Sequence, residues 1–295
     1  MALRSPRGRR RGVFVLVLVV ILFMAVGSAR FYTDVLWFQE VGFTSVLWKT
    51  LTTQFALGLA VGLLVGIVVW LNLVIAGRVA PPYRTTRFEV VGRVDPMDQY
   101  RDLFAPYLKW IRVGVAAFVG LLTGLGASSG WQTFLMWINR VSFGTNDPQF
   151  DLDIGFYVFE LPWYNLVLGW LWFAILASLL LSIAAHFFHG SIRPEGGLRG
   201  VWPGALAHIS VLLGGLALVK AAQYWLGRYG LNFSVRGAVT GASYTDVNAH
   251  LPALSLLAII SLVSAALFLV NIRFKRLSLP LAAVGLWVFI SIVAG

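Results

Sequence analysis

Seven stretches of this chain are apolar over about the length that a lipid bilayer requires. A helix needs about 20 apolar residues to cross roughly 30 Å of hydrocarbon. Polar segments separate the stretches, which are residues 12–29, 55–77, 111–127, 163–186, 204–226, 251–271 and 278–294. The pattern predicts an all-α membrane protein, a bundle of seven transmembrane helices whose main partner is the lipid bilayer.

Prolines mark the predicted starts of three of these helices. Pro162 precedes the fourth helix, Pro252 lies in the first turn of the sixth, and Pro280 lies in the first turn of the seventh. Proline is tolerated there because the N–H that it lacks would have no partner within the helix. Residues 12–29 also resemble a signal peptide, but their apolar run exceeds the roughly 7 to 15 residues usual for one. We therefore expect a retained first helix.

The positions of the basic residues predict the orientation. With a cytoplasmic N-terminus, alternation places residues 78–112, 187–203 and 272–277 in the cytoplasm too. Together with the first 11 residues, these segments hold 17 of the 23 lysines and arginines. Such a bias is typical of cytoplasmic loops. We expect a multi-pass plasma-membrane protein with a cytoplasmic N-terminus and an extracytoplasmic C-terminus.

The predicted outer loops are rich in aromatic residues. Residues 131–144 predict a helix in the headgroup region, because apolar residues recur there at helical spacing, at Trp131, Phe134, Leu135 and Ile138. Residues 30–51 have the same character and predict a second interfacial segment, so we expect interfacial helices in the outer loops beside the bundle. The alternation in FDLDI, residues 150–154, predicts apolar side chains on one face and Asp151 and Asp153 on the other.

Composition excludes several classes of protein. The chain is 59% hydrophobic and 12% charged, with a mean hydropathy of +0.81. Its net charge of +11 follows from the loop arginines, so we expect no nucleic-acid binding. Cysteine is absent, which removes thiolate chemistry and disulfides. Neither a serine-nucleophile motif nor a phosphate-binding glycine loop is present, and we expect neither enzymatic activity nor a cofactor.

Four carboxylates of the long outer loop are candidate partner contacts. They are Asp147, Asp151, Asp153 and Glu160. Calcium binding is an alternative, because hard cations take clustered oxygen ligands. The spacing lacks a calcium-binding loop pattern, and solvated carboxylates are the default, so we expect no metal.

Polar residues inside the predicted spans are few. Asn72, Lys220 and Gln223 are candidates for a transport path, although a helix contact for Asn72 and snorkelling for Lys220 are simpler roles. His186, His189 and His208 lie near the cytoplasmic ends of two helices. Three imidazoles are a zinc-ligand set, but histidine is also common at a membrane interface, which is the reading we favour.

Glycines recur every fourth residue in the second span, at Gly58, Gly62 and Gly66. Such a face without side chains allows another helix to approach closely. Gly120 and Gly124 repeat the spacing in the third span. We expect packing within the bundle, and a homo-oligomer through the glycine face is the alternative.

One region resembles a known family. The run FGTNDPQFDLDIGFYVFELPWY, together with WFQEVGF after the first span, resembles bacterial membrane proteins of uncharacterised protein family 0182. The matching positions are Asp147-Pro148, Asp153, Phe156-Tyr157, Phe159 and Leu161-Pro162. The resemblance implies a seven-helix membrane region followed by a large extracytoplasmic domain, and it implies no catalytic or binding residues.

These observations favour a membrane scaffold or anchor that holds an extracytoplasmic domain or partner protein. The last span, 278–294, ends without a polar flank, so we expect a longer polypeptide that continues outside the cell. The family resemblance implies that the part after residue 295 is a large extracytoplasmic domain. The alternative function is a transporter or channel for a lipid, a small amphiphile or an ion.

Overall fold

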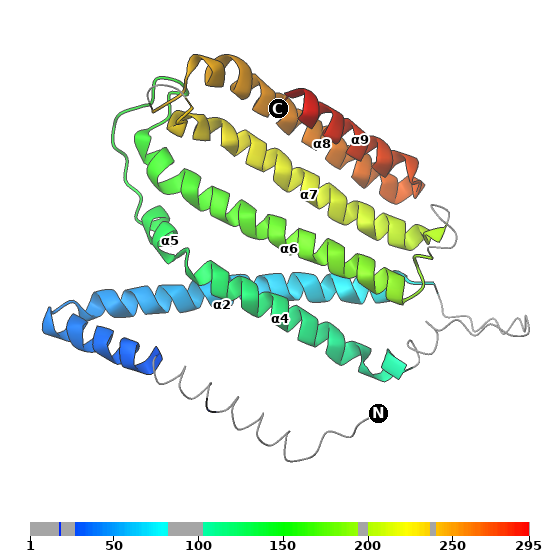
Figure 1. Ribbon diagram of the computed structural model, residues 1–295, viewed down its shortest axis with the longest axis horizontal. Coiled ribbons are helices and arrows are strands. Elements are labelled where there is room, and N and C mark those ends of the chain that lie inside the picture. The colour runs from blue at the N-terminus through cyan, green and yellow to red at the C-terminus, as the bar shows by residue number, and fades with distance from the viewer. Residues whose placement is uncertain (1–17, 19–26, 82–102, 194–199, 237–239, 295) are drawn as a thin grey trace, which may run out of the picture. The chain divides into compact units, whose positions relative to one another are not determined.

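The computed structural model is all-helical over the part of the chain that it describes (Figure 1). The described residues are 18, 27–81, 103–193, 200–236 and 240–294. The chain divides into two compact units, Met1–Phe55 and Ala56–Gly295, and each is described by itself.

Five helices are long and apolar enough to cross a membrane. They are Thr44–Val79, Ala105–Ser128, Phe156–Phe188, Pro203–Phe233 and Asp246–Phe274. They consist of α2 (Thr44–Val79), η1 (Ala105–Tyr107) with α4 (Leu108–Ser128), η2 (Phe156–Glu160) with α6 (Leu161–Phe188), α7 (Pro203–Gly230) with η4 (Leu231–Phe233), and η5 (Asp246–His250) with α8 (Leu251–Phe274). The all-α membrane fold therefore agrees with the sequence at five of the seven predicted spans.

The other two predicted spans are not confirmed as helices that cross a membrane. Most of residues 12–29 lies outside the described residues. The last prediction, 278–294, corresponds to α9 (Ser278–Ala294), an apolar helix of 17 residues that is shorter than the other five. Seven crossings therefore remain a prediction.

The predicted interfacial segment at residues 30–51 is mostly helical. Residues 27–40 are helical, and α2 begins at Thr44, so only residues 41–43 connect the two helices. Gly42 makes this tight connection possible with a φ of +75°, a value that glycine adopts at little cost. Trp37 lies on the first of these helices and Phe43 lies in the connection, and both side chains are exposed.

Within the second unit, α2 and α4 meet along the predicted glycine face. A Cβ atom added at Gly62 would lie 2.8 Å from the carbonyl oxygen of Gly120, and one added at Gly58 would lie 2.8 Å from that of Gly124. The two backbones are in direct contact, as in other small-residue helix pairs. The expected packing within the bundle is thus what the structure shows, and α4 occupies the face that a homo-oligomer would need.

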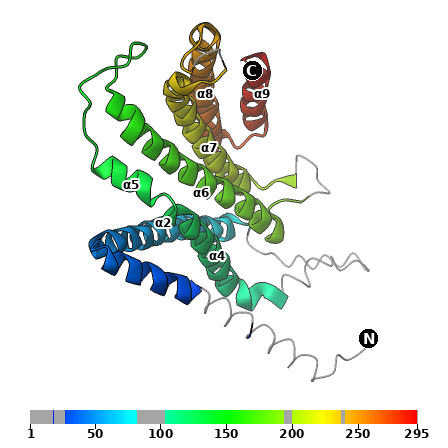
Figure 2. The same ribbon diagram turned by 60° about the vertical axis from the view of Figure 1, so that its left-hand side comes forward.

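The remaining helices pack side by side. Figures 1 and 2 show α7 between α6 and α8, with α9 beside α8. Small buried hydroxyl residues line these contacts, including Ser178 on α6, Ser210 on α7 and Ser264 on α8. Asn271 on α8 donates a 2.9 Å hydrogen bond to the Ser210 hydroxyl. Small and polar contacts of this kind favour association of helices in lipid.

Both α6 and α8 begin with a π-helical turn before a Leu-Pro pair. The N–H of Leu161 bonds to the carbonyl of Phe156, and the N–H of Leu251 bonds to that of Asp246. A proline ring clashes with the carbonyl four residues before it in a regular α-helix, so the wider turn accommodates Pro162 and Pro252.

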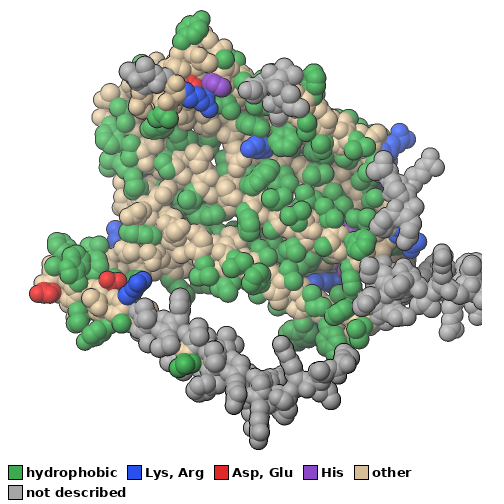
Figure 3. All heavy atoms as spheres, in the orientation of Figure 1, with side chains coloured by type: hydrophobic (Ala, Val, Ile, Leu, Met, Phe, Trp, Pro, Cys, Tyr) green, Lys and Arg blue, Asp and Glu red, His purple; other side chains and the backbone are tan. Residues whose placement is uncertain are grey.

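Figure 3 shows that hydrophobic side chains spread across the visible face, as expected of helices that contact lipid.

Candidate functional site

The two ends of the second unit contain most of its polar contacts. We call the end where α7 finishes and α6 and α8 begin the capped end; of the described residues, it comprises 139–155, 231–236 and 240–250. We call the opposite end, around the C-terminus of α6 and the N-terminus of α7, the histidine end. Sequence analysis pointed to residues at both.

Asp147 organises the capped end. Its carboxylate accepts hydrogen bonds from the backbone amides of Gln149, Phe150 and Leu152, at 2.9, 2.8 and 3.1 Å. The Tyr157 hydroxyl donates a fourth hydrogen bond at 2.7 Å, and the Asn232 amide a fifth at 3.1 Å. One side chain therefore ties together the loop before α6, the first turn of that helix and the segment after α7.

These contacts change the acidity of Asp147. Burial alone would raise the pKa of the carboxyl, but the hydrogen bonds from Tyr157 and from the three backbone amides outweigh it and lower the pKa from 3.8 to about 2. Asp147 is therefore ionised at neutral pH and holds the loop as an acceptor of hydrogen bonds. A solvated side chain, the default expected from the sequence, does not describe it.

Asp153 has a similar local role. It accepts a 2.6 Å hydrogen bond from the Ser142 hydroxyl and others from the backbone amides of Phe143, Gly144 and Gly155. The bond from Ser142, followed by that from the Phe143 amide, lowers the pKa of Asp153 to about 2. The carboxylate thus closes the loop against the start of the helix that follows it.

Asp246 is a third organising carboxylate, and the sequence analysis missed it. Its side chain is 0% exposed and accepts a 3.2 Å hydrogen bond from Arg236 and a 2.8 Å bond from the Ser243 hydroxyl. The Asp246 amide donates to the Ser243 hydroxyl at 3.2 Å, and the Ser243 amide donates to the Asp246 carboxylate at 3.1 Å. This reciprocal pair is a capping box, and the signal was present as Ser-x-x-Asp before an apolar run.

The other two predicted contact residues are arranged differently. Asp151 is exposed, has a φ of +55° and accepts a 3.0 Å hydrogen bond from Asn146. Glu160 accepts a hydrogen bond from Tyr164 and lies 3.5 Å from Arg140. The four candidate carboxylates thus lie near one end of the unit but in separate hydrogen-bond sets. Among the described residues, no group of three or more His, Asp or Glu side chains is placed to hold a metal.

The predicted alternation over residues 150–154 is wrong. Ile154 is 39% exposed, whereas Asp153 is half-buried. The chain turns on itself here, because the Asp147 amide bonds to the carbonyl of Leu152 and the Ile154 amide bonds to that of Thr145. A short turn of this kind has no continuous strand face.

Part of the predicted interfacial helix is present as α5 (Trp131–Ile138), which ends six residues before the predicted limit of 144. Aromatic rings join it to α6, since Trp137 stacks on Trp163 with ring centroids 5.1 Å apart. Arg140 then lies over the ring of Trp137.

Exposed apolar side chains lie on the same segments as the hydrogen-bonded aspartates. Five large apolar side chains on the capped-end segments are more than half exposed, and we call them the apolar rim: Val141, Phe143, Phe233, Val235 and Tyr244. Tyr244 is the most exposed of them, at 84%. Exposed apolar groups on loops fixed by hydrogen bonds are typical of contact surfaces.

At the histidine end, three side chains form a directed chain of hydrogen bonds. The Asn72 amide nitrogen donates to the carbonyl of Val68, so its oxygen is the acceptor that faces His208 Nε2 at 3.0 Å. His208 therefore carries its proton on Nε2 and accepts on Nδ1, 3.1 Å from His186 Nε2. His186 must donate through Nε2, which leaves its buried Nδ1 as an acceptor without a partner among the described residues.

His189 does not join this chain. Its Nε2 lies 3.3 Å from the Arg112 guanidinium, which can only donate, and its Nδ1 faces the carbonyl of Ala185 at 2.6 Å. His186 and His208 bond to each other and not to a common point, so the three imidazoles are not arranged as a zinc-ligand set.

The predicted transport-path residues lie far apart. Asn72 contacts His208, whereas Lys220 is 12 residues further along α7, about 18 Å along the helix axis. Lys220 lies over the rings of Trp172 and Tyr224, at 5.7 and 4.9 Å from their centroids. Gln223 is half-buried one turn beyond Lys220. Asn72 thus belongs to the histidine end, and the two α7 residues belong to another region.

Comparison with known proteins identifies the family but not a biochemical activity. The chain is 42% identical to a UPF0182 protein of Frankia casuarinae over 99% of this chain and 29% of the relative. It is 41% identical to a UPF0182 protein of Thermobifida fusca over 94% of this chain and 27% of that relative. It is 38% identical to a UPF0182 protein of Streptomyces coelicolor over 95% of this chain and 28% of that relative. The chain therefore spans less than a third of the length of these relatives. No solved structure matches it. The family model described as Uncharacterised protein family (UPF0182) matches residues 11–295, and the chain belongs to this family.

Proposed function

We propose that this region is a membrane anchor that presents the capped end as a docking platform for an extracytoplasmic domain or partner protein. The observation that carries the proposal is the apolar rim. Its side chains are exposed, yet the segments that bear them are fixed by hydrogen bonds to Asp147, Asp153 and Asp246. A rigid exposed surface loses little conformational entropy when a partner binds.

Two further features support this role. The expected orientation, with arginine-rich segments in the cytoplasm, would turn the capped end to the outside. The relatives in the comparison are more than three times as long as the matched region, which supports a larger protein that needs an anchor. The extracytoplasmic domain, the plasma-membrane location and the orientation are parts of this proposal.

Photo-crosslinking in cells tests the platform. A benzoylphenylalanine residue placed at Tyr244 or Phe143 is expected to crosslink to protein. The matched controls are Phe118 in α4 and Phe289 in α9, which are 61% and 64% exposed but lie on apolar helices. These positions are expected to crosslink to lipid. Crosslinks to lipid alone at all four positions would show that the rim lies against the bilayer and would overturn the proposal.

A transporter or channel is the second candidate, and the position of Lys220 is the observation in its favour. The separation of Lys220 from Asn72 argues against a continuous polar path between them. Flux of ions or lipids through reconstituted protein, abolished by Lys220→Ala, would favour transport over anchoring.

A further inference from the structure

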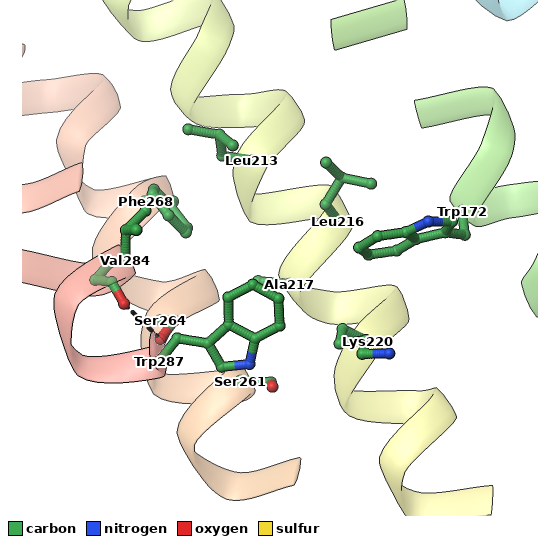
Figure 4. A pocket seen from close by; sticks show the side chains of 11 residues that line it. Trp172, Leu213, Leu216, Ala217, Lys220, Ser261, Ser264, Phe268, Val284 and Trp287 are labelled. Atoms are coloured by element: carbon green, nitrogen blue, oxygen red, sulfur yellow. Dashed lines mark hydrogen bonds between the residues drawn. The ribbon is translucent and has the colours of Figure 1, made fainter. Parts of the chain in front are cut away.

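A cavity of about 90 Å³ lies among α6, α7, α8 and α9 (Figure 4). Of the described residues that line it, Lys220 alone carries a charge. Most of the wall is apolar, with Leu213 and Leu216 from α7, Phe268 from α8 and Val284 from α9. The cavity is partly open, and Val284 is 41% exposed.

The polar groups of the wall offer hydrogen-bond donors. The Ser261 hydroxyl and the Trp287 indole Nε1 are buried, and neither has a partner among the described residues. Figure 4 shows both residues around the cavity with Lys220. Indole nitrogen and ammonium groups only donate, and a hydroxyl can donate. Buried donors without partners are uncommon in folded proteins, so the Ser261 hydroxyl and the Trp287 indole, beside the half-buried Lys220, suggest a ligand that accepts hydrogen bonds.

The charge of Lys220 also lacks a counterion in the part of the chain that is described. The ion pairs found there are Arg140–Glu160 and Arg236–Asp246. An ammonium group within a transmembrane helix is costly, and the rings of Trp172 and Tyr224 compensate part of that cost by cation–π contact. An anion in the cavity would compensate the rest.

We propose that this cavity binds the carboxylate of a fatty acid. One negative charge balances the one ammonium, and the carboxylate oxygens can accept from Lys220, Ser261 and Trp287. The volume is about that of three water molecules in the liquid. It therefore holds the head group and the first methylene groups, while the rest of the acyl chain leaves through the opening along apolar helix surface.

The depth of the cavity favours a fatty acid over a phospholipid. Lys220 is eight residues before Arg228 on α7, about 12 Å along the helix axis. A phosphodiester with its glycerol and two acyl chains would have to leave the headgroup region and enter a cavity smaller than its head. This site is separate from the capped end, so it does not depend on the anchoring proposal.

Tryptophan quenching tests the site in the purified 295-residue chain. The probe is stearate brominated at mid-chain, because bromine quenches indole fluorescence at short range and Trp172 and Trp287 line the cavity. We expect saturable quenching in the wild type, weakened about tenfold by Lys220→Met, since a charge-assisted hydrogen bond is lost. Lys220→Arg, which keeps the charge, is expected to bind more tightly than Lys220→Met.

The matched control is Lys109→Met. Lys109 also lies over a tryptophan, Trp110, at 5.5 Å from the ring centroid, but on α4 and outside the cavity wall. We expect this variant to bind as the wild type does. Equal binding by the wild type and Lys220→Met, or equal loss in the two lysine variants, would overturn the proposal.

Competition identifies the head group without any substitution. Unlabelled stearate is expected to displace the probe, whereas its methyl ester and dodecyl phosphate are expected to displace it weakly. Equal displacement by the ester would show that the carboxylate is not recognised, and stronger displacement by dodecyl phosphate would show a phosphate site. If Lys220→Met fails to fold, this competition and the weaker binding expected for Ser261→Ala still decide the question.

Discussion

The Tyr157 hydroxyl donates a 2.7 Å hydrogen bond to Oδ2 of Asp147. The bond joins the π turn at the start of the Phe156–Phe188 helix to the loop that precedes it. The same carboxylate accepts from Asn232 beyond α7, so a single side chain connects two helices that meet at the capped end.

Replacing Asp147 should therefore destabilise the protein. We expect Asp147→Ala to lower the free energy of unfolding by about 2 kcal/mol, because several donors lose a charged acceptor. Thermal or denaturant unfolding in detergent measures the change. Asp151→Asn is the control in the same loop, because the exposed Asp151 carboxylate bonds only to Asn146 in the described structure and asparagine tolerates its φ of +55°. An equal loss in both variants would contradict the role of Asp147.

The same residue predicts a dependence of stability on pH. The folded-state pKa of Asp147 is about 2, below the ordinary 3.8, so its stabilisation is complete above about pH 4 and is lost as the pH falls through about 2. The stability difference between the wild type and Asp147→Asn should shrink over that interval. Asp153 titrates in the same pH range. Because both proteins contain Asp153, the difference in stability between them reports on Asp147. A difference that stays constant from pH 6 to about 2 would contradict this prediction.

The contact between α2 and α4 predicts unlike effects for two neighbouring glycines. A Cβ atom at Gly124 would lie 2.5 Å from the carbonyl oxygen of Gly58, whereas one at Gly126 would have no atom within 4 Å. We expect Gly124→Ala to cost about 1–3 kcal/mol by forcing the helices apart. Gly126→Ala should be neutral or stabilising, because alanine favours the helix. Similar unfolding midpoints for the two variants would show that this contact is not close in the folded protein.

The histidine end predicts specific tautomers. His186 and His208 should each carry a proton on Nε2, whereas His189 should carry it on Nδ1. Nitrogen NMR of protein labelled at its four histidines, with single substitutions for assignment, distinguishes these forms. Asn72→Leu should alter the His208 signals most, because it removes the acceptor for Nε2–H. A proton on His186 Nδ1 would contradict the proposed direction of the chain.

Cysteine labelling tests the expected orientation. The chain has no native cysteine, so Thr145→Cys at the capped end and Ser278→Cys at the start of α9 introduce single, exposed thiols. An impermeant maleimide should label position 145 in intact cells and should label position 278 only after lysis. The opposite result would place the capped end in the cytoplasm and would exclude the extracytoplasmic platform.

Sequence patterns predicted the features that depend on residues near one another in the chain. They did not predict the contacts between residues far apart in the chain. Apolar runs predicted the long helices, and the spacing of Gly58, Gly62 and Gly66 predicted a close helix contact, because both signals repeat along one helix. The role of Asp147 depends on Tyr157 and Asn232, and no periodicity relates an aspartate to a residue 85 positions away.

Three errors have separate physical reasons. The early start of α2 was missed because polar residues in a helix that extends beyond the lipid resemble those of a loop. The role of Asp246 was missed although Ser-x-x-Asp is a local signal, because the long apolar run that follows it dominates the hydropathy pattern of this segment. The alternation near Asp153 was misjudged because a tight turn satisfies its own amides with side-chain carboxylates.

The paired π turns have a consequence for how these helices tolerate insertions and deletions. A bond from residue i to i+5 contains one more residue than an α-helical bond, so each turn shifts all later side chains by about 100° around the helix axis. Loss of one residue from 156–160 or 246–250 would rotate the following span and carry buried Ser178 or Asn271 toward the lipid. Natural length variation should therefore be rare in these two five-residue windows and should concentrate in the loops before them.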